Sequence, residues 1–179
     1  LRNIGKDAKD AVPALILALE DKVSNVRGSA AEALGSVGEG SEDVVPALIQ
    51  TLKDPNAWVR GHVAMALENV GKDATPALIL LLQDPNPDTR ISTVETLGQI
   101  GSKDIIPVLI EVLQDQNQSV RSTVVEALEN MGKDAVPDLI PKLQESHFYV
   151  RVSAAETLGN IGKDAKDAVP ALILALEDK

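Results

Sequence analysis

Charged residues at a regular spacing are the most chemically suggestive feature of this sequence of 179 residues. An arginine recurs along the chain, and an acidic residue stands six positions before each copy. The pairs are Asp21/Arg27, Asp54/Arg60, Asp84/Arg90, Asp115/Arg121 and Glu145/Arg151. A planar guanidinium can hold a carboxylate and a backbone carbonyl at the same time. Pairs repeated in register therefore favour a structural role over a catalytic one.

Residues that usually carry catalysis or bind metals are scarce. The chain has no cysteine and only two histidines, His62 and His147, which lie far apart in the sequence. Gly-Lys-Asp at 71–73, 132–134 and 162–164 imitates a phosphate loop but lacks its earlier glycine and its Ser or Thr after lysine. We therefore predict no catalytic residue, no metal site and no cofactor.

Composition narrows the class of partner. The net charge is −10, and phosphate binding needs clustered Lys and Arg, so nucleic acid and anionic membranes are unfavourable partners. No run of about 18 apolar residues is present, and no signal peptide is visible. We expect a cytoplasmic protein that binds another protein or a peptide, with no membrane contact.

The elements that position these residues repeat along the chain. Residues 1–22 and 158–179 agree at 21 of 22 positions, and looser copies lie between them. A proline recurs at intervals of 30 to 33 residues, and the arginine keeps the same intervals. Such a period predicts an array of stacked helical units. The prolines are Pro13, Pro46, Pro76, Pro107, Pro137 and Pro170.

Each unit is predicted to hold two helices. Helix A begins near the proline and carries Leu, Ile and Leu on one face; helix B carries the arginine and an apolar stripe of period 3.6. An aspartate three residues before each proline is the expected N-cap of helix A, and a glycine the expected C-cap of helix B. Pro141 should bend the fifth helix A. The complete pairs are 6–38, 39–71, 72–101, 102–132 and 133–162, flanked by partial units 1–5 and 163–179.

The pattern resembles HEAT-like repeats, in the short form associated with phycobilisome lyases. The shared residues are Pro-x-Leu-Ile-x-x-Leu-x-Asp, followed by x-Val-Arg-x-x-Ala-Ala-x-x-Leu-Gly-x-Ile-Gly. The resemblance implies a right-handed all-α solenoid with helix B on the concave face. It also implies that the acid–arginine pairs form a ladder of hydrogen bonds between successive units.

A non-catalytic scaffold for protein–protein interaction is the function we expect. The alternative is a subunit of an enzyme of the phycobilin lyase or isomerase type, which these repeats also resemble. Deoxyhypusine hydroxylases use similar repeats but hold iron with His-Glu motifs, and no His-Glu dipeptide occurs here.

The expected binding surface lies on helix B, away from its apolar stripe. There we expect a basic or apolar extended segment to bind in the groove, since exposed aromatic and Met residues are enriched at interface cores. Trp58 and Tyr149 have a second interpretation, in which they fold back and shield the neighbouring unit; the acidic row could equally be a plain solvated face. The candidates are Trp58, His62, Met65, Ile91, Glu95, Glu126, Tyr149, Val152 and Glu156.

Two further surfaces are apolar. Leu17, Leu80 and Leu174 should face solvent on helix A and could form a second contact surface. The partial units at both ends should also present apolar surface, because repeat arrays need polar caps. End-to-end self-association, or further repeats in a parent protein, would cover those ends.

Overall fold

The computed structural model describes residues 10–38 and 41–177. The chain divides into two compact units, 1–100 and 101–179, and each is described by itself. Over the described ranges the secondary structure is helical, with α-helices and short 3-10 helices joined by tight turns. The predicted all-α class is confirmed. No helix in these ranges is both long and apolar enough to cross a membrane.

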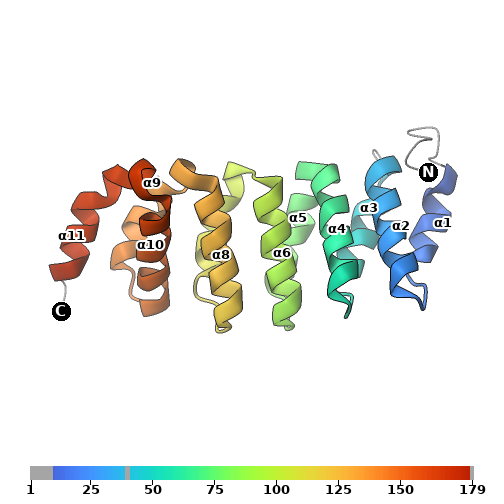
Figure 1. The fold of residues 1–179 in the computed structure, drawn as a ribbon, viewed down its shortest axis with the longest axis horizontal. Helices are drawn as coiled ribbons and strands as arrows, with labels where there is room; N and C mark the ends of the chain where they lie inside the picture. The colour runs from blue at the N-terminus through green and yellow to red at the C-terminus, as the bar shows by residue number, and fades with distance from the viewer. Residues whose placement is uncertain (1–9, 39–40, 178–179) are drawn as a thin grey trace. The chain divides into compact units, whose positions relative to one another are not determined.

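The described part of unit 1 holds three helix pairs in two layers. One layer holds the B helices, which Figure 1 shows side by side, and the other holds the A helices, each packed on the B helix that follows it. The 3-10 helix η2 (Gly71–Ala74) leads into the third pair. The B helices are α2 (Ser24–Val37), α4 (Ala57–Val70) and α6 (Pro87–Ile100); the A helices are α1 (Val12–Ala18), α3 (Val44–Thr51) and α5 (Thr75–Leu81).

Unit 2 repeats the same plan. Its B helices are α8 (Gln118–Met131) and α10 (Phe148–Ile161), which pack against each other. Its A helices are α7 (Ile106–Val112), α9 (Val136–Leu139) and α11 (Val169–Glu177). Four 3-10 helices lie at their ends, namely η3 (Lys103–Ile105), η4 (Gly132–Asp134), η5 (Ile140–Gln144) and η6 (Gly162–Ala168).

The core of each unit is built from the predicted stripes. The leucine seven residues after each arginine is fully buried, as is the leucine two residues after the proline in α3, α5, α7 and α9. Small residues next to them let the helices approach closely. Gly35 of α2 is an example, because a Cβ there would lie 2.6 Å from Ala66 Cα of α4.

The ends of helix B are as predicted at most positions. Gly71, Gly101, Gly132 and Gly162 have positive φ angles, a conformation that side-chain-bearing residues rarely adopt. Gly38 differs, with φ −83°. The positive φ explains why this terminator is glycine in the later repeats.

The start of helix A differs from the prediction. Asp43 is the N-cap of α3 but makes no side-chain capping bond, and in α1, α5, α7 and α9 the N-cap is the apolar residue after the aspartate. These N-caps already have αR dihedral angles, because a 3-10 turn runs directly into the helix. Side-chain caps occur on helix B instead, where Asn56 and Asn117 accept from backbone N–H groups.

Pro141 interrupts the fifth helix A as predicted. The α-helix ends at Leu139, and the chain continues as the 3-10 helix η5 through Pro141. The missing proline N–H removes one α-helical hydrogen bond at this point.

Two helix glycines provide a matched test of the close packing between α2 and α4. Gly35→Ala should lower the free energy of unfolding by about 1–2 kcal/mol, since the new Cβ meets backbone atoms of Ala66. Gly61→Ala should raise it by about 0.5–1 kcal/mol, because no atom lies within 4 Å of that Cβ and alanine favours the helix. Urea denaturation of both variants checks this; equal effects would contradict the packing argument.

Candidate functional site

The recurring arginine clamps the turn between helix A and helix B in every complete repeat. Its Nη1 donates to the carbonyl oxygen of the acidic residue six positions earlier and to the next carbonyl. The first of these distances is 2.9 Å for Arg27 and Arg60, and 2.7 Å for Arg90, Arg121 and Arg151. The clamp fixes where helix B begins.

The acidic residue closes the same turn from its own side. Oδ1 of Asp21, Asp54, Asp84 and Asp115 accepts from the backbone N–H two residues later, at 2.7 to 3.0 Å. In the fifth repeat Glu145 Oε1 accepts instead from the Ser146 N–H, at 3.2 Å. Acid and arginine thus act together on one turn.

Arg27 also links two successive repeats through a bidentate ion pair. Arg27 Nε and Nη2 donate to the carboxylate oxygens of Asp54 at 2.6 and 2.9 Å. Desolvation alone would raise the pKa of Asp54, but the hydrogen bonds from Arg27 and from the Asn56 N–H lower it below its usual value. This contact has the geometry that the resemblance implies for a ladder.

Arg60 of unit 1 and Arg121 of unit 2 have other side-chain partners. Arg60 Nε donates to Ser92 Oγ at 3.2 Å, and Asp84 pairs with Lys53 at 2.9 Å. In unit 2 the guanidinium of Arg121 lies 3.8 Å from the ring centroid of Tyr149, and Glu145 pairs with Lys142 at 3.2 Å. The sequence did not indicate these substitutes.

Acid should weaken the fold through these carboxylates. The pKa values of Asp54, Asp84 and Glu145 are lowered in the folded chain, so each contributes stability above its unfolded pKa that is lost as pH falls through its folded pKa. We expect the free energy of unfolding to fall below about pH 4. Urea denaturation between pH 7 and pH 3 checks this, and Asp54→Asn should flatten the fall. An unchanged slope in that variant would contradict the assignment.

The B-helix layer of unit 1 presents an exposed apolar surface on α4. Trp58 is 47% exposed and Met65 56% exposed, with the half-buried His62 between them. On α6, Ile91 is half-buried and Glu95 exposed, and on α2 Glu32 is half-buried. We call this set of six residues the α4 surface.

Trp58 is exposed on one side and held on the other. Its ring lies against Gly28 of α2, where an added Cβ would come within 2.1 Å of Trp58 Cζ3. The ring centroids of His62 and Trp58 are 4.1 Å apart, and His62 Nδ1 is 3.9 Å from Glu32 Oε2. Trp58 therefore covers part of the neighbouring repeat, as its second interpretation expects, and leaves about half of its surface exposed to solvent.

A comparable surface lies on α10 of unit 2. Val152 is exposed, and Tyr149 is half-buried over Arg121. Phe148 is exposed beside Tyr149, with ring centroids 3.9 Å apart. Glu156 on α10 and Glu126 on α8 are exposed as well.

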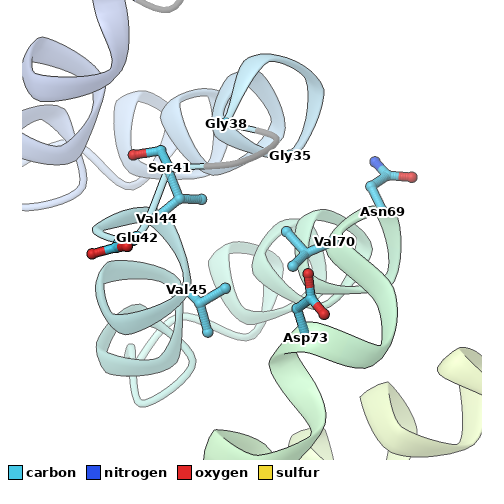
Figure 2. A pocket seen from close by; sticks show the side chains of 9 residues that line it. All are labelled: Gly35, Gly38, Ser41, Glu42, Val44, Val45, Asn69, Val70 and Asp73. Carbon is cyan, nitrogen blue, oxygen red and sulfur yellow. The ribbon is translucent and has the colours of Figure 1, made fainter.

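A pocket of about 400 Å³ lies in unit 1 where α2 ends, α3 begins and α4 ends. Figure 2 shows Val45 and Val70 directed toward the opening and Glu42 directed away from it. Its polar lining residues are Ser41, Glu42, Asn69 and Asp73. For a protein partner the α4 surface is the stronger candidate, because it carries the exposed Trp58 and Met65. Across the described part of the chain, no group of three His, Asp or Glu could hold a metal ion.

Comparison with known families decides the class. The family model for HEAT repeats matches residues 1–68, 75–139 and 106–179. The chain belongs to the HEAT-repeat family. The predicted α-solenoid class is thereby confirmed, and family membership is consistent with a repeat that serves as a scaffold. No curated protein matches the chain.

Two solved structures have a fold similar to that of this chain. The complex of CpcE and CpcF of phycocyanin lyase from Nostoc sp. PCC7120 is 22% identical, with a TM-score of 0.56 over 76% of this chain and 91% of that chain. An engineered protein is 20% identical, with a TM-score of 0.50 over 93% of this chain and 85% of that chain. At these identities the likeness shows the fold alone.

Two residues of these surfaces were not predicted from the sequence, Gly28 beside the α4 surface and Phe148 on α10. The Trp58 ring packs against Gly28. The only signal of this contact in the sequence was the glycine itself, one residue after Arg27. Phe148 begins α10, three residues before Arg151, a position to which the apolar period assigned no contact.

Proposed function

We propose that this HEAT array is a non-catalytic scaffold whose α4 surface binds an extended segment of a partner protein. The segment carries an apolar residue that packs on Trp58 and Met65, with Lys or Arg beside it. The observation that carries the proposal is the half-exposed Trp58 held in place by Gly28, next to the exposed Met65.

Trp58 has the properties of a binding hot spot. Large aromatic side chains dominate the energy of many interfaces, and a side chain that is already ordered loses less entropy on binding. Packing on Gly28 and His62 orders the Trp58 ring before any ligand arrives. Met65 lies two turns further along α4 and supplies a flexible apolar contact.

The charges around this apolar strip select a basic ligand. Glu95 of α6 is exposed, Glu32 of α2 is half-buried beside His62, and Glu68 of α4 is exposed near Met65. The net charge of −10 would attract a cationic segment at long range. We further propose the surface formed by Tyr149, Val152, Glu126 and Glu156 as a second contact for ligands of the same kind.

A pair of matched peptides tests this proposal. The first has eight or nine residues, with an apolar residue near each end and Lys or Arg between; the second has Glu in place of every Lys and Arg. Fluorescence anisotropy with the intact protein should show binding of the basic peptide only, weakening as salt increases. The variant Glu95→Gln should slow association and flatten the salt dependence. Equal binding of both peptides would contradict the proposal.

A further inference from the structure

The pair Arg27/Asp54 shows how a recurring arginine of this chain binds a carboxylate. Nη1 of Arg27 is fixed on two carbonyl oxygens of its own turn. The other edge of the guanidinium, Nε and Nη2, donates to the two carboxylate oxygens of Asp54 at 2.6 and 2.9 Å. One end of the group thus orders the side chain, and one edge binds the anion.

Arg121 of α8 has the same clamp but binds no anion. Its Nη1 donates to the carbonyl oxygens of Asp115 and Gln116 at 2.7 and 3.2 Å. The acid of the following repeat is Glu145, and its carboxylate pairs with Lys142 at 3.2 Å instead. Within the described residues, no acceptor bonds Arg121 Nε or Nη2.

The unused edge of Arg121 is both ordered and open to solvent. The guanidinium Cζ lies over the Tyr149 ring, 3.8 Å from its centroid. Guanidinium donors lie in the plane of the group, so a ring on its face does not use them. Across the described ranges, the buried side-chain atoms that lack a hydrogen-bond partner belong to His62, Thr75 and His147. Arg121 Nε and Nη2 are not among these atoms, so solvent reaches both of them.

An exposed apolar strip lies beside the Tyr149 ring. Phe148 is exposed, and its ring centroid lies 3.9 Å from that of Tyr149. Val152, also exposed, stands four residues after Phe148 on α10 and therefore falls on the same side of the helix. The net charge of −10 opposes the approach of an anion at long range. A ligand that also packs an apolar group on Phe148 is therefore favoured over a bare anion.

We propose that Arg121 and Tyr149 form a carboxylate-binding site, and that its ligand is the free C-terminal carboxylate of a peptide whose last residue is apolar. Arg121 Nε and Nη2 donate to the two carboxylate oxygens, as Arg27 donates to Asp54. The last side chain packs on Phe148, since it branches from the same Cα as the carboxylate. An Asp or Glu side chain offers the same carboxylate but brings no apolar group with it.

This site takes an anion, so it is separate from the binding of basic segments proposed above. Tyr149 belongs to both surfaces of unit 2, but the α4 surface shares no residue with the carboxylate site. The proposal therefore does not depend on the function proposed for the α4 surface. Trp58→Ala should leave every affinity described below unchanged.

Two small ligands and two ring signals test the site on the intact protein. Tyr149 and Phe148 are the one tyrosine and the one phenylalanine of the sequence, so isotope labelling of these residue types gives one set of NMR ring signals for each. N-acetyl-leucine should shift both sets saturably. N-acetyl-leucine amide, in which an amide replaces the carboxylate, should bind at least about tenfold more weakly. Equal affinity for the acid and the amide would overturn the proposal.

A third ligand distinguishes the two sources of a carboxylate. The α-amide of N-acetyl-glutamate has its only carboxylate on the side chain. It should bind more weakly than N-acetyl-leucine, because it places no apolar side chain on Phe148. An affinity equal to or above that of N-acetyl-leucine would overturn the assignment to a chain terminus.

A double variant places an internal carboxylate on the site. Lys142→Thr/Glu145→Asp copies the residues at Thr51 and Asp54, where the aspartate binds the preceding arginine. The variant removes the lysine that holds Glu145 and shortens the acid to the length that serves at Asp54. The new carboxylate should occupy the Nε and Nη2 edge of Arg121, so N-acetyl-leucine should bind at least about tenfold more weakly.

Glu126→Asp is the matched control for the double variant. It shortens an exposed acid of α8 by the same methylene group and should leave the affinity unchanged. If N-acetyl-leucine binds the double variant as tightly as it binds the parent chain, the ligand does not use the edge of Arg121 and the proposal is overturned. The comparison of acid and amide needs no variant, so it decides the matter even where the double variant does not fold.

Discussion

Replacing Asp54 by alanine should lower the free energy of unfolding by about 2–3 kcal/mol. The carboxylate accepts two hydrogen bonds from Arg27 of the preceding repeat and one from the Asn56 N–H of its own turn. Its removal leaves the Arg27 guanidinium without the acceptor that it holds at 2.6 Å. Urea denaturation followed by circular dichroism measures the change.

Asp88 provides the matched control for this experiment. Its carboxylate lies 4.0 Å from Arg60 Nη2, and its side chain is mostly exposed. Exposed ion pairs of this kind contribute little, so Asp88→Ala should change stability by less than about 0.5 kcal/mol. If Asp88→Ala lowers the free energy of unfolding as much as Asp54→Ala does, the ion pair between repeats contributes no more than an exposed one.

Trp58→Ala should weaken binding of the basic peptide by about 2 kcal/mol or more, if Trp58 is the hot spot that we propose. The substitution removes the largest exposed apolar side chain of the α4 surface and also empties the seat on Gly28. Isothermal titration calorimetry with the intact protein measures the loss of affinity.

The control for Trp58 must be exposed, apolar and on the other layer. Leu80 of α5 is 76% exposed and lies on helix A. Leu80→Ala should therefore leave peptide affinity unchanged, whereas Met65→Ala should weaken it by a smaller amount than Trp58→Ala. If Leu80→Ala weakens binding and Trp58→Ala does not, the helix A surface with Leu17 and Leu80 becomes the better candidate.

The fold could be predicted from the sequence because its determinants are local and repeated. The apolar period of helix B placed Leu34, Leu67 and Leu128 in the core, and all three are fully buried. Glycine at the end of helix B was equally informative, because its positive φ is a local requirement. The aspartate N-caps predicted for α1, α5, α7 and α9 were wrong, because the chain there enters the helix one residue later, from an N-cap residue with αR dihedral angles. Asp43 is the N-cap of α3 but makes no side-chain capping bond.

The candidate site was less predictable because its contacts join residues far apart in the sequence. Helical spacing placed Trp58 and Met65 on one face, but it could not show that Gly28 seats the Trp58 ring. The acid–arginine spacing likewise suggested uniform pairs. The structure gives Arg27 the carboxylate of Asp54, whereas Arg60 bonds Ser92 and the corresponding carboxylate of Asp84 pairs with Lys53.

The emission of Trp58 tests the central claim most directly, because it is the one tryptophan in the sequence. Addition of the basic peptide to the intact protein should shift this emission to shorter wavelength, since a ligand packed on the exposed half of the ring removes it from water. The shift should saturate with the same Kd as the anisotropy titration and diminish in Met65→Ala. A peptide that binds with full affinity and leaves the Trp58 emission unchanged would contradict the assignment of the α4 surface as the binding site.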